Sequence, residues 1–166
     1  MNNYEHLKND KNFSIVDFEH ADFILGQTGE ATTLAKIRQL FPNVNKYTDF
    51  WSPFDYYNKN DNGEVDMIFE VKTRRCSKTQ YPTLAFGKTK LDFAKDEMIK
   101  SPNLRVIICW LLNDENLYFW EYTGDNSKDF HIGSIANIKR NQKHSPSVMV
   151  YTDKIKLLNH HNILSA

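Results

Sequence analysis

Two carboxylates and a lysine lie on neighbouring extended segments of this chain. Asp55 occurs in SPFDYY, and Glu70 and Lys72 occur in MIFEVKTRR after a short polar turn. Side chains two residues apart on a strand leave the same face, so Glu70 and Lys72 should point the same way. The turn would lay Asp55 beside them. Carboxylate oxygens suit Mg²⁺ or Mn²⁺, which keep several waters and accept phosphate oxygens.

Such a group of residues could hydrolyse a phosphodiester bond. The metal would polarise the phosphate and lower the pKa of a bound water. Lys72 would orient or deprotonate that water, or stabilise the charge that builds on the phosphorane. Asp66 lies on the same face of the segment and is an alternative ligand or supporting group.

Glu30 belongs to a predicted helix that is capped by Thr28 and closed by Pro42. It shares a helical face with Leu34 and Ile37, so it should point toward the body of the domain. A carboxylate there has two explanations. It suits the helix dipole in the first turn, or it supports the metal site.

The elements that must position these residues follow from periodicity. Residues 47–58 are extended, and residues 64–73 alternate as a strand with one buried and one polar face. Residues 74–87 form a loop, and 88–100 form a helix. Residues 104–112 fit a strand buried on both faces, followed by a strand over 117–122.

The remaining residues, 123–166, form a mixed tail. Residues 130–139 fit a short helix or strand, and 147–158 fit a strand. The whole order of elements predicts an α/β fold with a mixed β-sheet flanked by helices.

Residues 72–91 contain basic side chains and no acidic residue. We predict that the basic side chains after the motif bind nucleic-acid phosphates; they are Arg74, Arg75, Lys78, Lys88 and Lys90. The last two open the predicted helix, where backbone N–H groups can also bind phosphate. An ordinary exposed basic loop is the alternative.

Together these residues resemble the PD-(D/E)XK, or restriction-endonuclease-like, nuclease superfamily. Asp55 in SPFD is similar to the family's first aspartate, although Phe54 stands between the proline and the aspartate. Glu70-Val71-Lys72 resembles the (D/E)XK element, and Glu30 resembles the glutamate of the family's first core helix. The resemblance covers residues 26–122, whose element order is similar to the family's αβββαβ core, and leaves 123–166 as a C-terminal extension.

The resemblance implies a role for each of these residues. Asp55, Glu70 and the Val71 carbonyl would bind Mg²⁺ or Mn²⁺, Lys72 would be catalytic and Glu30 auxiliary. The implied activity is metal-dependent hydrolysis of DNA, most simply as an endonuclease. A homodimer would suit such an enzyme, because two cuts need two sites. The rival interpretations are a non-catalytic nucleic-acid-binding module on the same fold and a subunit of a larger assembly.

Length and composition favour a single soluble domain over residues 1–166. The 21 basic and 21 acidic residues cancel, which excludes a general coat of positive charge but not a local basic surface. No apolar run approaches the roughly 20 residues that a membrane span needs. The N-terminal sequence MNNYEHLKND lacks the apolar segment of a signal peptide. We therefore expect an intracellular protein with no membrane partner.

Overall fold

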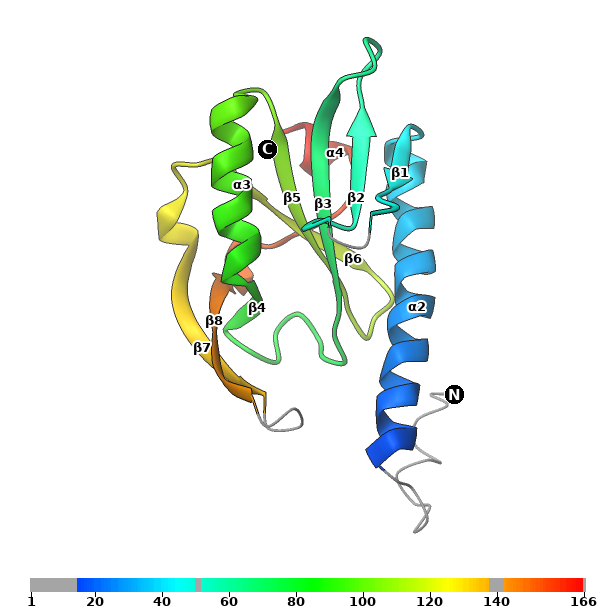
Figure 1. Cartoon of the computed structure of the whole chain (residues 1–166), viewed down its shortest axis with the longest axis vertical. Coiled ribbons are helices and arrows are strands. Elements are labelled where there is room, and N and C mark those ends of the chain that lie inside the picture. The colour runs from blue at the N-terminus through cyan, green and yellow to red at the C-terminus, as the bar shows by residue number, and fades with distance from the viewer. Residues whose placement is uncertain (1–14, 50–51, 138–141, 166) are drawn as a thin grey trace.

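A six-stranded mixed β-sheet lies at the centre of the computed structural model, which describes residues 15–49, 52–137 and 142–165 (Figure 1). Its strands, in spatial order, are β1 (Val44–Lys46), β2 (Tyr56–Lys59), β3 (Val65–Thr73), β5 (Arg105–Leu111), β6 (Leu117–Tyr122) and β9 (Lys156–Leu157). The β3–β5 pair is parallel and the other pairs are antiparallel. The predicted α/β fold with a mixed sheet is confirmed at this level.

A second sheet of three antiparallel strands forms within the described residues. It contains β4 (Thr83–Gly87), β8 (Gln142–Tyr151) and β7 (Phe130–Asn137), with β8 in the middle. The loop predicted over residues 74–87 is therefore wrong at its end, where β4 forms. Its partner is far away in the sequence, as the pairing of Ala85 with Met149 shows. Of the two interpretations of residues 130–139, the structure has a strand over Phe130–Asn137, and residues 138–139 lie outside the described residues.

The helices flank the central sheet. They are α2 (Ile15–Leu40), α3 (Lys88–Lys100) and the short α4 (His160–Leu164), with 3-10 turns η1 (Ser127–Asp129) and η3 (Thr152–Lys154). The predicted bounds of α3 are confirmed. The predicted start of the first helix is wrong, because α2 begins at Ile15 and Thr28 lies inside it rather than capping it. None of the helices in the described ranges is long and apolar enough to cross a membrane.

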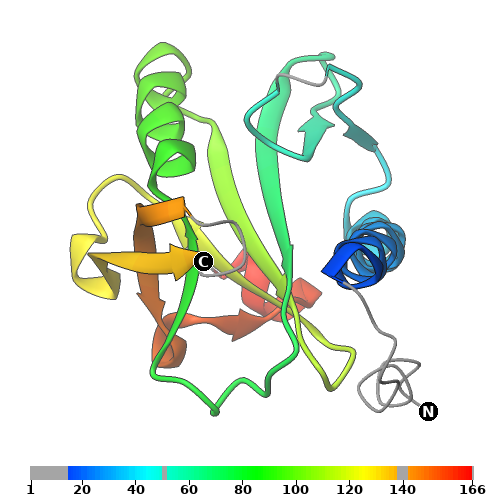
Figure 2. The same cartoon turned by 60° about the horizontal axis from the view of Figure 1, so that its bottom comes forward.

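Both faces of the central sheet are covered. Figures 1 and 2 show α3 and the second sheet on one side of it and α2 on the other. Along β5, Ile108 and Trp110 join the apolar cluster beneath α3, whereas Ile107 and Cys109 join the cluster beneath α2. The prediction that residues 104–112 form a strand buried on both faces is confirmed.

Strand β3 is also buried on both faces, which corrects the predicted polar face. Phe69 belongs to the cluster on the α2 side, and Ile68 belongs to the cluster on the α3 side. Glu70 shares the α3 side and is 0% exposed. The face predicted to be polar is therefore interior, because β5 pairs with β3 while α3 covers that side.

Candidate active site

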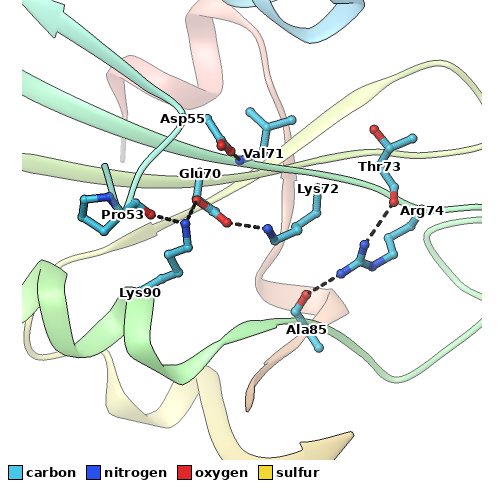
Figure 3. Close-up of polar contacts among 9 residues, drawn as sticks. All are labelled: Pro53, Asp55, Glu70, Val71, Lys72, Thr73, Arg74, Ala85 and Lys90. Carbon is cyan, nitrogen blue, oxygen red and sulfur yellow. Dashed lines mark hydrogen bonds and ion pairs between the residues drawn. The ribbon is translucent and has the colours of Figure 1, made fainter. Parts of the chain in front are cut away.

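Glu70 is the centre of the candidate site. Lys72 Nζ donates a hydrogen bond to Glu70 Oε1, and Lys90 Nζ lies 2.9 Å from Glu70 Oε2 (Figure 3). The second contact is an ion pair only, since Oε2 accepts no hydrogen bond within the described part of the chain. A fully buried carboxylate is thus held between the ammonium groups of two lysines whose side chains are 28% and 26% exposed.

Asp55 is fixed by two hydrogen bonds to β3 and one to Tyr47. Its backbone N–H donates to the carbonyl of Phe69 at 3.0 Å, and its carbonyl accepts from the N–H of Tyr47 at 3.1 Å. Its side-chain Oδ2 accepts from the N–H of Val71 at 2.7 Å. The β2–β3 hairpin therefore places the Asp55 carboxylate beside the Glu70–Val71–Lys72 segment, as the short turn predicted.

Electrostatics connect the two carboxylates. Burial, and next the negative charge of Glu70, raise the pKa of Asp55 to about 6. The Val71 N–H and the ammonium groups of Lys72 and Lys90 oppose this change. Glu70 is fully buried and Asp55 is largely buried, and two such carboxylates that repel each other stabilise a nearby cation.

The donor set fits Mg²⁺ or Mn²⁺ only if water or substrate completes it. Among the described residues, no group of three or more histidines, cysteines and carboxylates could hold a metal ion. Mg²⁺ commonly uses just one or two protein carboxylates, together with waters and phosphate oxygens. Asp55 and Glu70 meet that need, and Glu70 Oε2 accepts no hydrogen bond from the described residues. The Val71 carbonyl as a third ligand stays a prediction.

Glu30 lies in the middle of α2, so the helix-dipole explanation for its carboxylate is wrong. The side chain is 43% exposed, and its Oε2 pairs with Lys46 Nζ at 2.7 Å. Its backbone carbonyl accepts a hydrogen bond from the hydroxyl of Tyr56 at 3.2 Å. Burial, then the charges of Glu30 and Asp55, raise the pKa of that hydroxyl. Glu30 is thus connected to the site through Tyr56, the residue after Asp55, and its auxiliary role stays a prediction.

Arg74 connects the end of β3 to β4 by hydrogen bonds. Its guanidinium donates to the carbonyls of Thr73 at 3.1 Å and Ala85 at 3.3 Å (Figure 3). Burial lowers its pKa. These bonds tie the end of β3 to β4, so Arg74 helps to place the strand that leads into α3.

The other predicted phosphate-binding residues lie in different surroundings. Lys88 pairs with Asp92 one turn along α3 at 2.6 Å, and Lys78 stands over the ring of Tyr118 at 5.9 Å. Arg75 is exposed. Phosphate binding by each of them stays a prediction.

Lys90 is the site residue that sequence reasoning placed in the wrong surroundings. Besides the ion pair with Glu70, its ammonium donates to the carbonyl of Pro53 and stands 5.9 Å from the ring centre of Phe54. Its location in the first turn of α3 was predicted. A signal for its inward direction was its position one helical turn before the buried Ala94, but that signal is weak without the tertiary structure.

No protein-family model matches the chain, and a search of curated proteins finds no match. We therefore describe the protein by its fold and by the residues of its candidate site. It is a mixed α/β protein with a buried glutamate, two lysines and an aspartate gathered at a central strand.

Proposed function

We propose that this protein is a nuclease that uses Mg²⁺ or Mn²⁺ to hydrolyse phosphodiester bonds in DNA, acting as an endonuclease. The observation that carries this proposal is the convergence at Glu70. Lys72 comes from the same strand, Lys90 from α3, and Asp55 from the segment before β2. Glu70 is 0% exposed on a central strand, and burying a carboxylate carries a large desolvation cost. A functional role would explain why a charged residue occupies this position.

The element order supports the likeness to the PD-(D/E)XK superfamily. Helix α2, strands β1 to β3, helix α3 and strand β5 follow one another in the order αβββαβ, with β4 added before α3. The Glu70-Val71-Lys72 element lies on β3, between an antiparallel neighbour and a parallel one. Membership of that superfamily is part of the proposal.

Each residue has a distinct task in the proposed reaction. Asp55 and Glu70, with the Val71 carbonyl, would hold the ion, which when bound polarises the phosphate and lowers the pKa of a bound water. The ammonium of Lys72 bonds to the buried Glu70 carboxylate, and the Lys72 side chain is partly exposed. From there it can orient the attacking water or stabilise charge on the phosphorane. The hydrogen bond from Val71 holds one Asp55 oxygen in place.

A groove of mixed polar and apolar lining beside the end of β3 could take part in binding a nucleic acid. Its volume is about 530 Å³. It is lined by Thr28, Gly29, Thr32, Lys36, Thr73, Arg74, Arg75, Leu111, Leu112, Asn113 and Glu115. Hydroxyls, amides and positive charges of this kind contact phosphate and sugar without reading sequence. The groove includes Thr28 and Gly29 of α2, whereas Glu70 lies on the opposite side of β3, where Lys90 of α3 reaches it. A nucleic-acid strand in the groove would therefore have to pass around the end of β3 to reach the proposed site.

Cleavage assays with matched variants test the proposal. Wild-type protein is incubated with Mg²⁺ or Mn²⁺ and with duplex, single-stranded and branched DNA. We expect Glu70→Gln and Lys72→Met to lower the rate by roughly 100-fold or more, because ion binding and charge stabilisation are lost. Glu97 and Lys100 form an ion pair on α3 that does not contact Glu70, so Glu97→Gln and Lys100→Met are the matched controls. Equal rates for Glu70→Gln and wild type would show that the assignment is wrong.

One observation favours a second candidate, a non-catalytic nucleic-acid-binding module. The charge of Glu70 is already balanced by two lysines, so the cluster can hold the fold together without a metal. This candidate predicts DNA binding without cleavage in any metal, and binding that survives Glu70→Gln.

Sedimentation of the same samples would test the expected homodimer.

A further inference from the structure

Lys90 reaches Glu70 from a different element than Lys72 does. Lys72 leaves the same strand two residues later, whereas Lys90 comes from the first turn of α3 and crosses to the strand (Figure 3). The two lysines also take different oxygens. Lys72 hydrogen-bonds to Oε1, and Lys90 stands 2.9 Å from Oε2 without forming a hydrogen bond to it.

The hydrogen bond of Lys90 goes to another acceptor. Its ammonium donates to the carbonyl of Pro53, just before the segment that carries Asp55. The ring of Phe54 lies beside it as a second favourable neighbour for a cation. Lys90 could therefore leave Oε2 and keep these contacts, while Glu70 would keep its hydrogen bond to Lys72.

We propose that Lys90 is a positioning residue that acts as an internal counter-cation, occupying Glu70 Oε2 until a divalent metal ion replaces it. This inference rests on the proposed function, because it assumes that Glu70 binds a metal. In the metal-free protein Lys90 keeps the buried Glu70 carboxylate compensated. The same contact lowers the affinity of the site for metal, since a divalent ion must displace a cation that is already there.

Metal titration of the full-length chain without DNA tests this competition. Binding of Mn²⁺ is measured by calorimetry for wild type and for Lys90→Gln, whose amide can still donate to the Pro53 carbonyl. We expect Lys90→Gln to bind Mn²⁺ roughly tenfold more tightly, because one positive charge next to the ion is removed. Lys88→Gln is the matched control, since Lys88 lies in the same helical turn but pairs with Asp92. It should change the affinity by less than about twofold.

A merely structural role for Lys90 gives a different result. In that case Lys90→Gln lowers the melting temperature and leaves the Mn²⁺ affinity unchanged or weaker, which overturns the proposal. Under the proposal, Mn²⁺ raises the melting temperature of Lys90→Gln more than that of wild type, because stabilisation follows affinity. Lys90→Arg keeps the charge and should retain the weak affinity of wild type.

A measurement on the wild type keeps the test independent of variant folding. The NMR signal of the Lys90 side-chain ammonium, assigned with Lys90→Arg, should shift when Mg²⁺ is added. The signal of Lys100, which pairs with Glu97, should not shift. A Lys90 signal that stays in place at saturating Mg²⁺ overturns the proposal.

The outcomes separate this inference from the proposed function. If neither wild type nor Lys90→Gln binds Mn²⁺, both are wrong. If wild type binds Mn²⁺ and Lys90→Gln binds it no more tightly, only the competition is wrong. If Lys90→Gln binds it and wild type does not, the competition is supported in its strongest form.

Discussion

At the scale of single residues, the site is a balance of buried charges. Glu70 is 0% exposed, and it remains compensated because two lysines reach it. Removing one partner of a buried ion pair costs more than the pair itself contributes, since it leaves an uncompensated charge. Asp55 lies beside this cluster, and its pKa is raised by burial and then by the negative charge of Glu70.

The raised pKa of Asp55 predicts a pH dependence of stability in the metal-free protein. An aspartate in the unfolded chain titrates near pH 4, whereas burial and Glu70 raise the pKa of Asp55 to about 6 in the fold. The folded protein therefore holds this proton more tightly between those values. The resulting stabilisation is complete below about pH 4 and is lost as the pH rises through 6.

Comparison with Asp55→Asn isolates this effect from other carboxylates. Urea denaturation in the presence of a chelator gives the free energy of unfolding of both proteins at several pH values. The stability of wild type relative to Asp55→Asn should fall by up to about 3 kcal/mol between pH 4 and pH 7. A difference that does not change with pH would contradict the proposed electrostatic environment.

At the scale of elements, the close approach of α2 to β3 shapes the edge of the site. Gly29 lies inside the helix, where an added Cβ would stand 2.2 Å from Thr73 Oγ1. The hydroxyl of Thr33, one turn later, bonds back to the carbonyl of Gly29 at 2.7 Å. The helix can therefore lie against the end of the Glu70-Val71-Lys72 strand only because position 29 has no side chain.

Gly29→Ala should destabilise the protein, although alanine is the better helix former. The clash with Thr73 forces the helix and strand apart, and we expect a loss of about 1–3 kcal/mol in the free energy of unfolding. The exposed Thr32 lies in the same helix, so Thr32→Ala should be neutral or slightly stabilising. Adding Thr73→Ala to Gly29→Ala should recover part of the loss, because the nearest atom is removed. A stabilising Gly29→Ala would show that this contact is not rigid.

At the scale of the whole molecule, an aromatic cluster joins the two sheets. Phe86 of β4 lies 6.4 Å from Trp110 of β5 and 6.1 Å from Trp120 of β6, measured between ring centres. Phe130 of β7 stacks edge-on against Trp120 at 5.6 Å. Strand β4 leads directly into α3, so the cluster also anchors the helix that carries Lys90.

Phe86→Ala should destabilise the protein strongly. Phe86 is 3% exposed, and truncating a buried phenylalanine costs about 3–5 kcal/mol. Urea denaturation followed by tryptophan fluorescence should show a lower midpoint with an unchanged slope. Ile99 on α3 is 79% exposed, so Ile99→Ala should change stability by less than about 0.5 kcal/mol. A similar midpoint for both variants would contradict the anchoring role of the cluster.

The local elements, and the neighbours that a hairpin brings together, could be predicted from the sequence. The bounds of α3 followed from helical spacing and the double burial of β5 from a continuous apolar run, because both patterns depend on residues a few positions apart. The pair Asn62-Gly63 predicted a tight turn before β3, and a turn forms there. Gly63 has a positive φ of 81° but Asn62 does not, so the turn is not the two-residue type that this pair favours. The proximity of Asp55 to Glu70 followed from that turn.

Which charged side chains are interior, and what they contact, depends on tertiary packing. Glu70 looked like part of a solvated strand face, and Lys90 looked like a surface cation. Their burial and pairing depend on α3 packing over β3, and β4 depends on a partner more distant still. The alternation of a strand is the same whether its polar face meets water or another layer. The sequence pattern therefore cannot distinguish the two cases, because the covering layer comes from residues far away along the chain.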